Sequence, residues 1–177
     1  LVHAFKYRGG WRLAVEMGEW FGAEMREGGL YGDVEVVVPV PLHWRKRLRR
    51  GYNQSEYLAE GMARSLGCGV DARSVVRRVH NRSQALSGRE RRWENVQGIF
   101  GVRNPAALAG KHILLVDDVL TSGFTVASCA EEILRRVPDC RLSVATLAVS
   151  RSELLTAHPL KPGRPPKERE YEYFLEP

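Results

Sequence analysis

The stretch Ile113-Leu-Leu-Val-Asp-Asp-Val-Leu-Thr-Ser-Gly-Phe-Thr125 decides the fold of this chain. It joins four apolar residues to two acids, Asp117 and Asp118, and then to a small turn that leads into a helix. In open α/β sheets, ligands bind beyond the carboxyl ends of the strands. The stretch therefore predicts a strand, a ligand-binding turn and a helix within an α/β domain.

The turn after the acids has the chemistry of an anion site. Amide N–H groups at a helix N-terminus lack acceptors within the helix and lie at the positive end of its dipole. Hydroxyl groups can add donors, and Gly123 lets the backbone approach a phosphate closely. The candidate phosphate-binding residues are Leu120, Thr121, Ser122, Gly123, Phe124 and Thr125.

Asp117 and Asp118 would repel a phosphate that lay directly beside them. They suit a ligand that places hydroxyl groups between the acids and the phosphate, and a ribose 5-phosphate does so. The alternative is that the acids are an exposed strand end and that the turn only caps a helix. The succession of strand, turn and helix favours the ligand site.

The residues that follow predict a βαβ unit. Apolar residues recur at helical spacing from Val126 to Val137, and 142–149 reads as a strand. Strand, helix and strand in this order indicate a parallel sheet. We expect the strand that begins at His112 to end at Val116, where the acids and the turn break the apolar run.

The preceding residues predict further elements of the same kind. We expect an amphipathic helix over 11–26, a buried strand over 34–38, a short strand at 75–76 and a strand-like pattern over 99–102. A second helix is expected after Asn53, which has Glu56 at capping-box spacing, and Gly67 and Gly69 stop it.

The net charge and its distribution indicate which classes of partner the chain could bind. The chain has 177 residues, enough for one α/β domain, and a formal net charge of +6. Basic residues cluster over 43–50 and 73–92, which indicates a polyanionic partner or a solvated face. The polyanion could be a phosphorylated metabolite or a nucleic acid, and the charge does not choose between them.

Three cysteines, none in a C-x-x-C pair, argue against a disulfide framework or a zinc site and favour reduced thiols in the cytoplasm. No apolar run is long enough to span a bilayer, and no signal peptide is visible, so we expect no membrane partner.

Residues 113–125 closely resemble the binding motif for 5-phosphoribosyl-1-pyrophosphate (PRPP) of type I phosphoribosyltransferases. More of the chain resembles one branch, the ComF/GntX-like family linked to bacterial competence. The matching pieces are His3–Tyr7, Pro39–Leu42, Arg50–Gln54, Gln84 with Leu86, and Arg91–Asn95 ahead of Phe100.

The resemblance implies a type I phosphoribosyltransferase fold, with a parallel sheet core flanked by helices and a small hood. We expect one domain over 1–157, with a hood or N-terminal helix in 1–33, and a proline-rich charged tail over 158–177. In that family a four-cysteine zinc module commonly precedes the domain. Either the module is missing from this sequence or the chain is a shorter member.

The resemblance also implies an activity. Ribose 5-phosphate would pass from PRPP to a nucleobase or another nitrogen acceptor, with release of pyrophosphate. Asp117 and Asp118 would act on the ribose, and Mg²⁺ would be held through the substrate without direct protein ligands. Arg45 and Arg50 would contact the pyrophosphate, and Arg89 and Arg91 would reach in from the loop over 80–95. No general base is evident.

A second hypothesis is a binding protein that senses PRPP without transferring it, or that handles single-stranded DNA. Single-strand binders interleave aromatic and basic residues, and Trp44, Tyr52 and Trp93 lie among the arginines. Turnover of PRPP would separate the two hypotheses. A homodimer is a further candidate assembly.

Overall fold

The computed structural model describes residues 10–29, 31–43, 47–48, 51–78 and 98–150. Within them the chain forms a four-stranded sheet with the order β2-β1-β5-β6 and a two-stranded sheet of β3 and β4. The strands are β1 (Val36–Pro39), β2 (Gly69–Val70), β3 (Val75–Arg77), β4 (Phe100–Val102), β5 (His112–Leu120) and β6 (Arg141–Val149). The helices are α1 (Gly10–Glu27), α3 (Gln54–Leu66), the short 3₁₀ helix η2 (Pro105–Ala107) and α5 (Phe124–Arg136).

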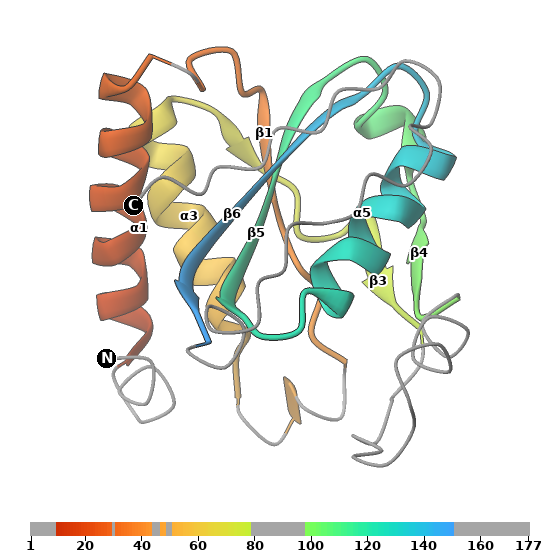
Figure 1. Ribbon diagram of the computed structural model, residues 1–177, viewed down its shortest axis with the longest axis horizontal. Coiled ribbons are helices and arrows are strands. Elements are labelled where there is room, and N and C mark those ends of the chain that lie inside the picture. Colours follow the sequence, from red (N-terminus) through yellow and green to blue (C-terminus); the bar gives the residue numbers. More distant parts are fainter. Residues whose placement is uncertain (1–9, 30, 44–46, 49–50, 79–97, 151–177) are drawn as a thin grey trace.

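The four-stranded sheet lies between two layers. Helices α1 and α3 lie on one side of it, and α5 lies on the other side with the β3–β4 pair (Figure 1). All pairs within this sheet are parallel, whereas β3 and β4 are antiparallel. The predicted α/β architecture with a parallel sheet is therefore confirmed.

Strands β1 and β5 supply both hydrophobic cores. Val38 and Leu115 belong to the cluster that also contains Ile133 of α5, whereas Val37 and Leu114 belong to the cluster on the α3 side. Successive residues of a strand point to opposite faces, so a strand covered on both faces must be apolar throughout. This is why the run of residues 113–116 predicted the strand well.

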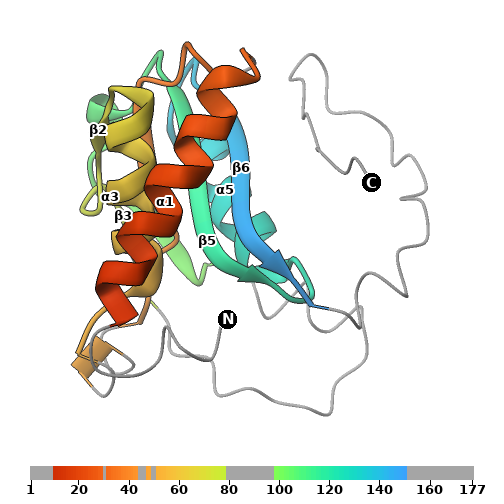
Figure 2. The ribbon, with the colours of Figure 1, turned by 90° about the vertical axis from the view of Figure 1, so that its left-hand side faces the viewer.

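Helices α1 and α3 pack against each other unusually closely, and glycine makes this possible. A Cβ atom at Gly61 would lie 2.1 Å from the carbonyl oxygen of Val15, and one at Gly18 would lie 2.3 Å from that of Leu58. Figure 2 shows α1 lying across α3 and the sheet. The segment 1–33 therefore contributes, in its described part, a helix of this layer.

Strand β5 is longer than the sequence predicted. It continues through the two acids to Leu120, because β6 pairs with it as far as Leu120 and Val149. The expectation that the strand ends at Val116 was wrong, since strand length here depends on a neighbouring strand. The short strand β2 was also missed, and Gly69, expected to stop the second helix, lies in it.

The second helix begins after Asn53, as expected, but the predicted capping box is absent. The Asn53 side chain makes no cap hydrogen bond, and its amide group donates instead to the carbonyl oxygen of Val40 at 3.2 Å. Glu56 forms an ion pair with Arg47 at 2.8 Å. Asn53 therefore joins the start of α3 to the segment that follows β1. Gly67 ends the helix in a left-handed conformation, as predicted.

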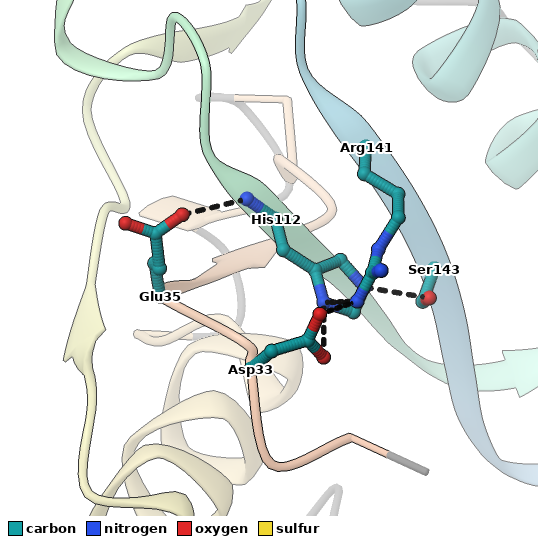
Figure 3. Close-up of polar contacts among 5 residues, drawn as sticks. All are labelled: Asp33, Glu35, His112, Arg141 and Ser143. Atoms are coloured by element: carbon teal, nitrogen blue, oxygen red, sulfur yellow. Dashed lines mark hydrogen bonds and ion pairs between the residues drawn. The ribbon is translucent and has the colours of Figure 1, made fainter.

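A polar network joins the amino ends of β5 and β6 to the segment before β1 (Figure 3). The buried His112 has its Nδ1 atom 3.0 Å from Oδ1 of Asp33 and its Nε2 atom 2.9 Å from Oγ of Ser143. Arg141 donates to Asp33, and the backbone N–H of His112 donates to Glu35 at 3.1 Å. This network lies at the amino edge of the sheet.

Candidate functional site

A cavity of about 130 Å³ lies at the opposite edge, where β1 and β5 end. Five parts of the chain line it: the segment after β1, the start of α3, the end of β3, the acids of β5 and the first turn of α5. Its lining residues are Val40, Pro41, Leu42, Asn53, Gln54, Ser55, Arg77, Asp117, Asp118 and Thr125. The position agrees with the rule that ligands bind beyond the carboxyl ends of parallel strands.

Asp117 is the most perturbed acid of the cavity. Burial, followed by the nearby charge of Asp118, raises the pKa of Asp117 from 3.8 to about 6. Two donors oppose this, because the hydroxyl of Ser55 and the backbone N–H of Asp118 each donate to Oδ1 of Asp117 at 3.0 Å. The structure thus keeps a largely buried carboxylate beside a second one, an arrangement typical of functional sites.

The turn between β5 and α5 leads directly into the N-terminus of the helix. Gly123 has φ 71°, in the left-handed region, and is the residue before helix α5 begins at Phe124. The N–H groups of the first helical turn have no acceptor within the helix. Leu120 lies in β5 rather than in the turn, and its carbonyl oxygen accepts from the N–H of Ser150 at 2.8 Å.

Of the site residues expected from the sequence, the structure places Asp117, Asp118 and Thr125 in the lining of this one cavity. Thr121, Ser122 and Gly123 form the turn beside it, and Phe124 begins α5. Arg45, Arg50, Arg89 and Arg91 lie outside the described residues, as do Trp44 and Trp93.

Two parts of the cavity were missed. The first is the buried start of α3, where Asn53, Gln54 and Ser55 line the cavity. The resemblance over Arg50–Gln54 was a signal for it, although a role was assigned only to Arg50 in that stretch. The second is Arg77 of β3, which belongs to the basic cluster over 73–92, where the resemblance singled out Arg89 and Arg91 instead.

The described residues contain no group of three or more His, Cys, Asp or Glu side chains placed to hold a metal ion. The two adjacent carboxylates are oxygen donors of the kind that Mg²⁺ accepts, and Mg²⁺ commonly uses one or two carboxylates together with substrate phosphates. In the described ranges, no helix has the length and apolar character needed to cross a bilayer.

A parallel sheet with paired acids near the carboxyl end of a central strand, followed by a glycine turn and a helix, is the arrangement found in α/β domains that bind ligands at the carboxyl edge of the sheet. A family model described as "Phosphoribosyl transferase domain" matches residues 53–174. The chain therefore belongs to the phosphoribosyltransferase domain family, and its parallel sheet flanked by helices agrees with the type I fold. The matched range includes most of the segment 158–177 that the sequence sets apart as a tail.

Sequence relatives agree with this assignment. The chain is 37% identical over 99 residues to the DNA utilization protein YhgH of Escherichia coli (strain K12), which covers 56% of this chain and 43% of that protein. It is 28% identical over 144 residues to the competence protein ComFC of Bacillus subtilis (strain 168), and this match covers 81% of this chain and 56% of ComFC. The chain thus spans about half the length of the curated relatives it matches.

The fold also resembles a solved structure. Glutamine PRPP amidotransferase from B. subtilis, in complex with ADP and GMP, superposes with a TM-score of 0.51 at 14% identity. The match covers 81% of this chain and 30% of the amidotransferase. At this identity the likeness concerns the fold alone.

Proposed function

We propose that this domain binds PRPP at the cavity lined by Asp117 and Asp118 and transfers its ribose 5-phosphate to a nitrogen acceptor, with release of pyrophosphate. The observation that carries the proposal is the pair Asp117 and Asp118, which line one cavity together with Thr125 from the first turn of α5. A ligand with hydroxyl groups next to a phosphate satisfies both features at once. A bare phosphate would satisfy only the turn.

Each part of the site has a role in this proposal. The turn residues Thr121 to Thr125 receive the 5-phosphate, because first-turn N–H groups and hydroxyls donate to its oxygens. Asp117 and Asp118 accept from the ribose hydroxyls. As the bond to pyrophosphate breaks, positive charge develops on the ribose ring, and the two carboxylates stabilise it.

Mg²⁺ would be held chiefly by the ligand's own oxygens, next to Asp117 and Asp118, and would neutralise the departing pyrophosphate. Asp117 with a pKa of about 6 is mainly ionised at neutral pH, so it can serve as an acceptor there. Arg45 and Arg50 remain proposed pyrophosphate contacts, and Arg89 and Arg91 remain proposed catalytic residues; all four lie outside the described residues.

The binding proposal is tested by calorimetric titration of PRPP with Mg²⁺ into the protein and into a variant carrying Asp117→Asn and Asp118→Asn. We expect binding by the unchanged protein and a loss of affinity on the order of 10²-fold or more in the variant. A variant with Glu27→Gln and Asp139→Asn is the matched control, because it removes two exposed acids that do not line the cavity. Absence of binding by the unchanged protein would overturn the proposal.

Transfer is tested separately, by measuring pyrophosphate release with a panel of nitrogen acceptors, nucleobases first. Release that depends on both an acceptor and the acid pair would establish an enzyme. Binding without release under every acceptor would establish a PRPP-binding protein in place of a transferase. The two outcomes share one site and differ only in turnover.

A role in handling single-stranded DNA is the second candidate function. The relatives named for DNA utilization and competence favour it, together with the two basic clusters. Of the aromatic residues considered, Tyr52 is described, and its ring contacts Tyr57 with centroids 5.7 Å apart. Affinity for single-stranded DNA that falls steeply with salt and depends on Trp44 or Trp93 would support this function.

A further inference from the structure

The charges around the cavity are unbalanced in a way that points to one residue. Two carboxylates, those of Asp117 and Asp118, line it. Among the described lining residues, Arg77 is the one with a positive charge. A polyanion cannot approach two carboxylates in a partly buried site unless cationic groups offset the repulsion. Arg77 is therefore placed where a phosphorylated ligand most needs a cation.

The guanidinium of Arg77 is held in place but is not fully satisfied. Its central carbon lies 5.4 Å from the ring centroid of Phe100, a distance at which a cation–π interaction is favourable. Its Nε atom is buried and makes no hydrogen bond. Such unsatisfied buried donors are rare in folded proteins and costly to keep. Arg77 is the one described residue with a buried side-chain nitrogen or oxygen atom in this state.

The electrostatic surroundings of Arg77 agree with a role in the site. Burial lowers the pKa of Arg77, and the charge of Asp117 opposes that shift. A guanidinium nevertheless stays protonated under all ordinary conditions. A permanent cation that loses hydration in the folded state gains most from an anion that brings new acceptors to it.

We propose that Arg77 is a ligand-binding residue of this cavity, whose guanidinium donates to phosphate oxygens of the bound ligand from the β3 side. The identity of that ligand as PRPP rests on the function proposed above. The position of Arg77, the unsatisfied nitrogen and the charge balance of the cavity do not depend on it. In the structure the guanidinium of Arg77 lies over the ring of Phe100, and the charge of Asp117 favours its protonated form.

A purely structural role for Arg77 makes a different prediction. If stacking on Phe100 were its whole purpose, replacing it with an apolar side chain of similar length would affect stability and leave ligand affinity unchanged. Arg77→Met keeps much of the aliphatic packing and removes the charge. Arg77→Lys keeps the charge and removes both the planar fork and the Nε atom.

The test compares Arg77→Met and Arg77→Lys with Arg78→Met. Arg78 is the exposed next residue, so its variant removes the same charge from the same end of β3. Titrations use PRPP with Mg²⁺ and, separately, inorganic pyrophosphate with Mg²⁺. We expect Arg77→Met to weaken PRPP binding on the order of 10- to 100-fold, Arg77→Lys to weaken it less, and Arg78→Met to change it by less than about threefold.

A pH series adds a second readout. Removal of the cation beside Asp117 should move the pH midpoint of PRPP binding upward in Arg77→Met and leave it in place in Arg78→Met. Thermal unfolding of each variant checks that it is folded. If Arg77→Met does not fold, Arg77→Lys still provides the test.

The two proposals fail differently. If the unchanged protein binds PRPP and Arg77→Met binds it as well as Arg78→Met does, the inference about Arg77 is wrong and the proposed function stands. If the unchanged protein binds pyrophosphate in an Arg77-dependent manner and does not bind PRPP, the inference stands and the proposed ligand is wrong. Binding of neither ligand overturns both.

Discussion

The hydroxyl of Ser55, at the start of α3, donates a hydrogen bond of 3.0 Å to Oδ1 of Asp117, which lies 62 residues further along the chain. The bond joins two walls of the cavity, because both residues line it. It also favours the ionised form of a carboxyl group that burial would otherwise neutralise. A serine with no catalytic chemistry of its own thus helps to set the charge of the site.

Ser55→Ala should make ligand binding more sensitive to acid. Loss of the donor raises the pKa of Asp117 further above about 6, by roughly one pKa unit or less. Affinity for PRPP should therefore fall more at pH 6 than at pH 8, as calorimetric titrations at the two pH values would show. Ser55→Thr keeps a hydroxyl and serves as the control. An equal loss at both pH values would contradict this account.

Asp117→Asn should stabilise the fold at neutral pH. The folded-state pKa of Asp117 lies above its ordinary value, so the native state binds more protons than the unfolded state between about pH 4 and pH 6. Its contribution to stability is present at low pH and is lost as the pH rises through this window.

A difference of about two pKa units corresponds to about 3 kcal/mol, so we expect the variant to gain on the order of 1–3 kcal/mol in unfolding free energy at pH 8. The gain should shrink towards zero near pH 4.5, as urea unfolding at both pH values would show. A gain that does not depend on pH would contradict the proposed titration of Asp117.

Gly61→Ala should destabilise the protein although alanine favours helices. The helix propensity gain is about 1 kcal/mol, whereas the new Cβ atom would lie 2.1 Å from the Val15 carbonyl oxygen, and forcing the helices apart costs more. We expect a net loss on the order of 2 kcal/mol in urea unfolding. Gly32→Ala is the control, since nothing lies within 4 Å of its added Cβ. Equal stability of the two variants would refute the steric reading.

Ser143→Ala should separate stability from binding. The change leaves Nε2 of the buried His112 without its partner at 2.9 Å, which should lower the unfolding free energy by about 1–2 kcal/mol. The network lies at the amino edge of the sheet, away from the cavity, so the affinity for PRPP should not change. Thermal unfolding and titration on the same preparation test both statements. A loss of affinity would show that the two edges are coupled.

Much of the fold could be predicted because the signals are local. The apolar run over 113–116 and the helical spacing after Val126 both predicted elements that the structure contains. The end of β5 could not be predicted, because it depends on pairing with β6 through Val119 and Leu120. The local sequence of a strand does not indicate which other strand will pair with it in the sheet.

The site also contains residues that the local sequence predicted and residues that only the fold brings together. Asp117, Asp118 and the turn lie within one short segment, so their spacing alone indicated a phosphate and a ribose. Arg77 and Ser55 reach the cavity from β3 and α3, and only the fold brings them there. Asn53 shows the limit of a local rule, since its side chain bonds to Val40 although its spacing to Glu56 fits a capping box.

The close contact of α1 with α3 requires a glycine pattern that can be searched for in other sequences. Gly18 and Gly22 are four residues apart on α1, and a Cβ atom at either would meet the backbone of α3 within 2.8 Å. Gly61 faces them from the middle of α3. A spaced glycine pair in the first helix, with a lone glycine in the helix before the short strand, is therefore a signature of this helix pair. It would identify the same layer in chains whose first helix has otherwise diverged beyond recognition.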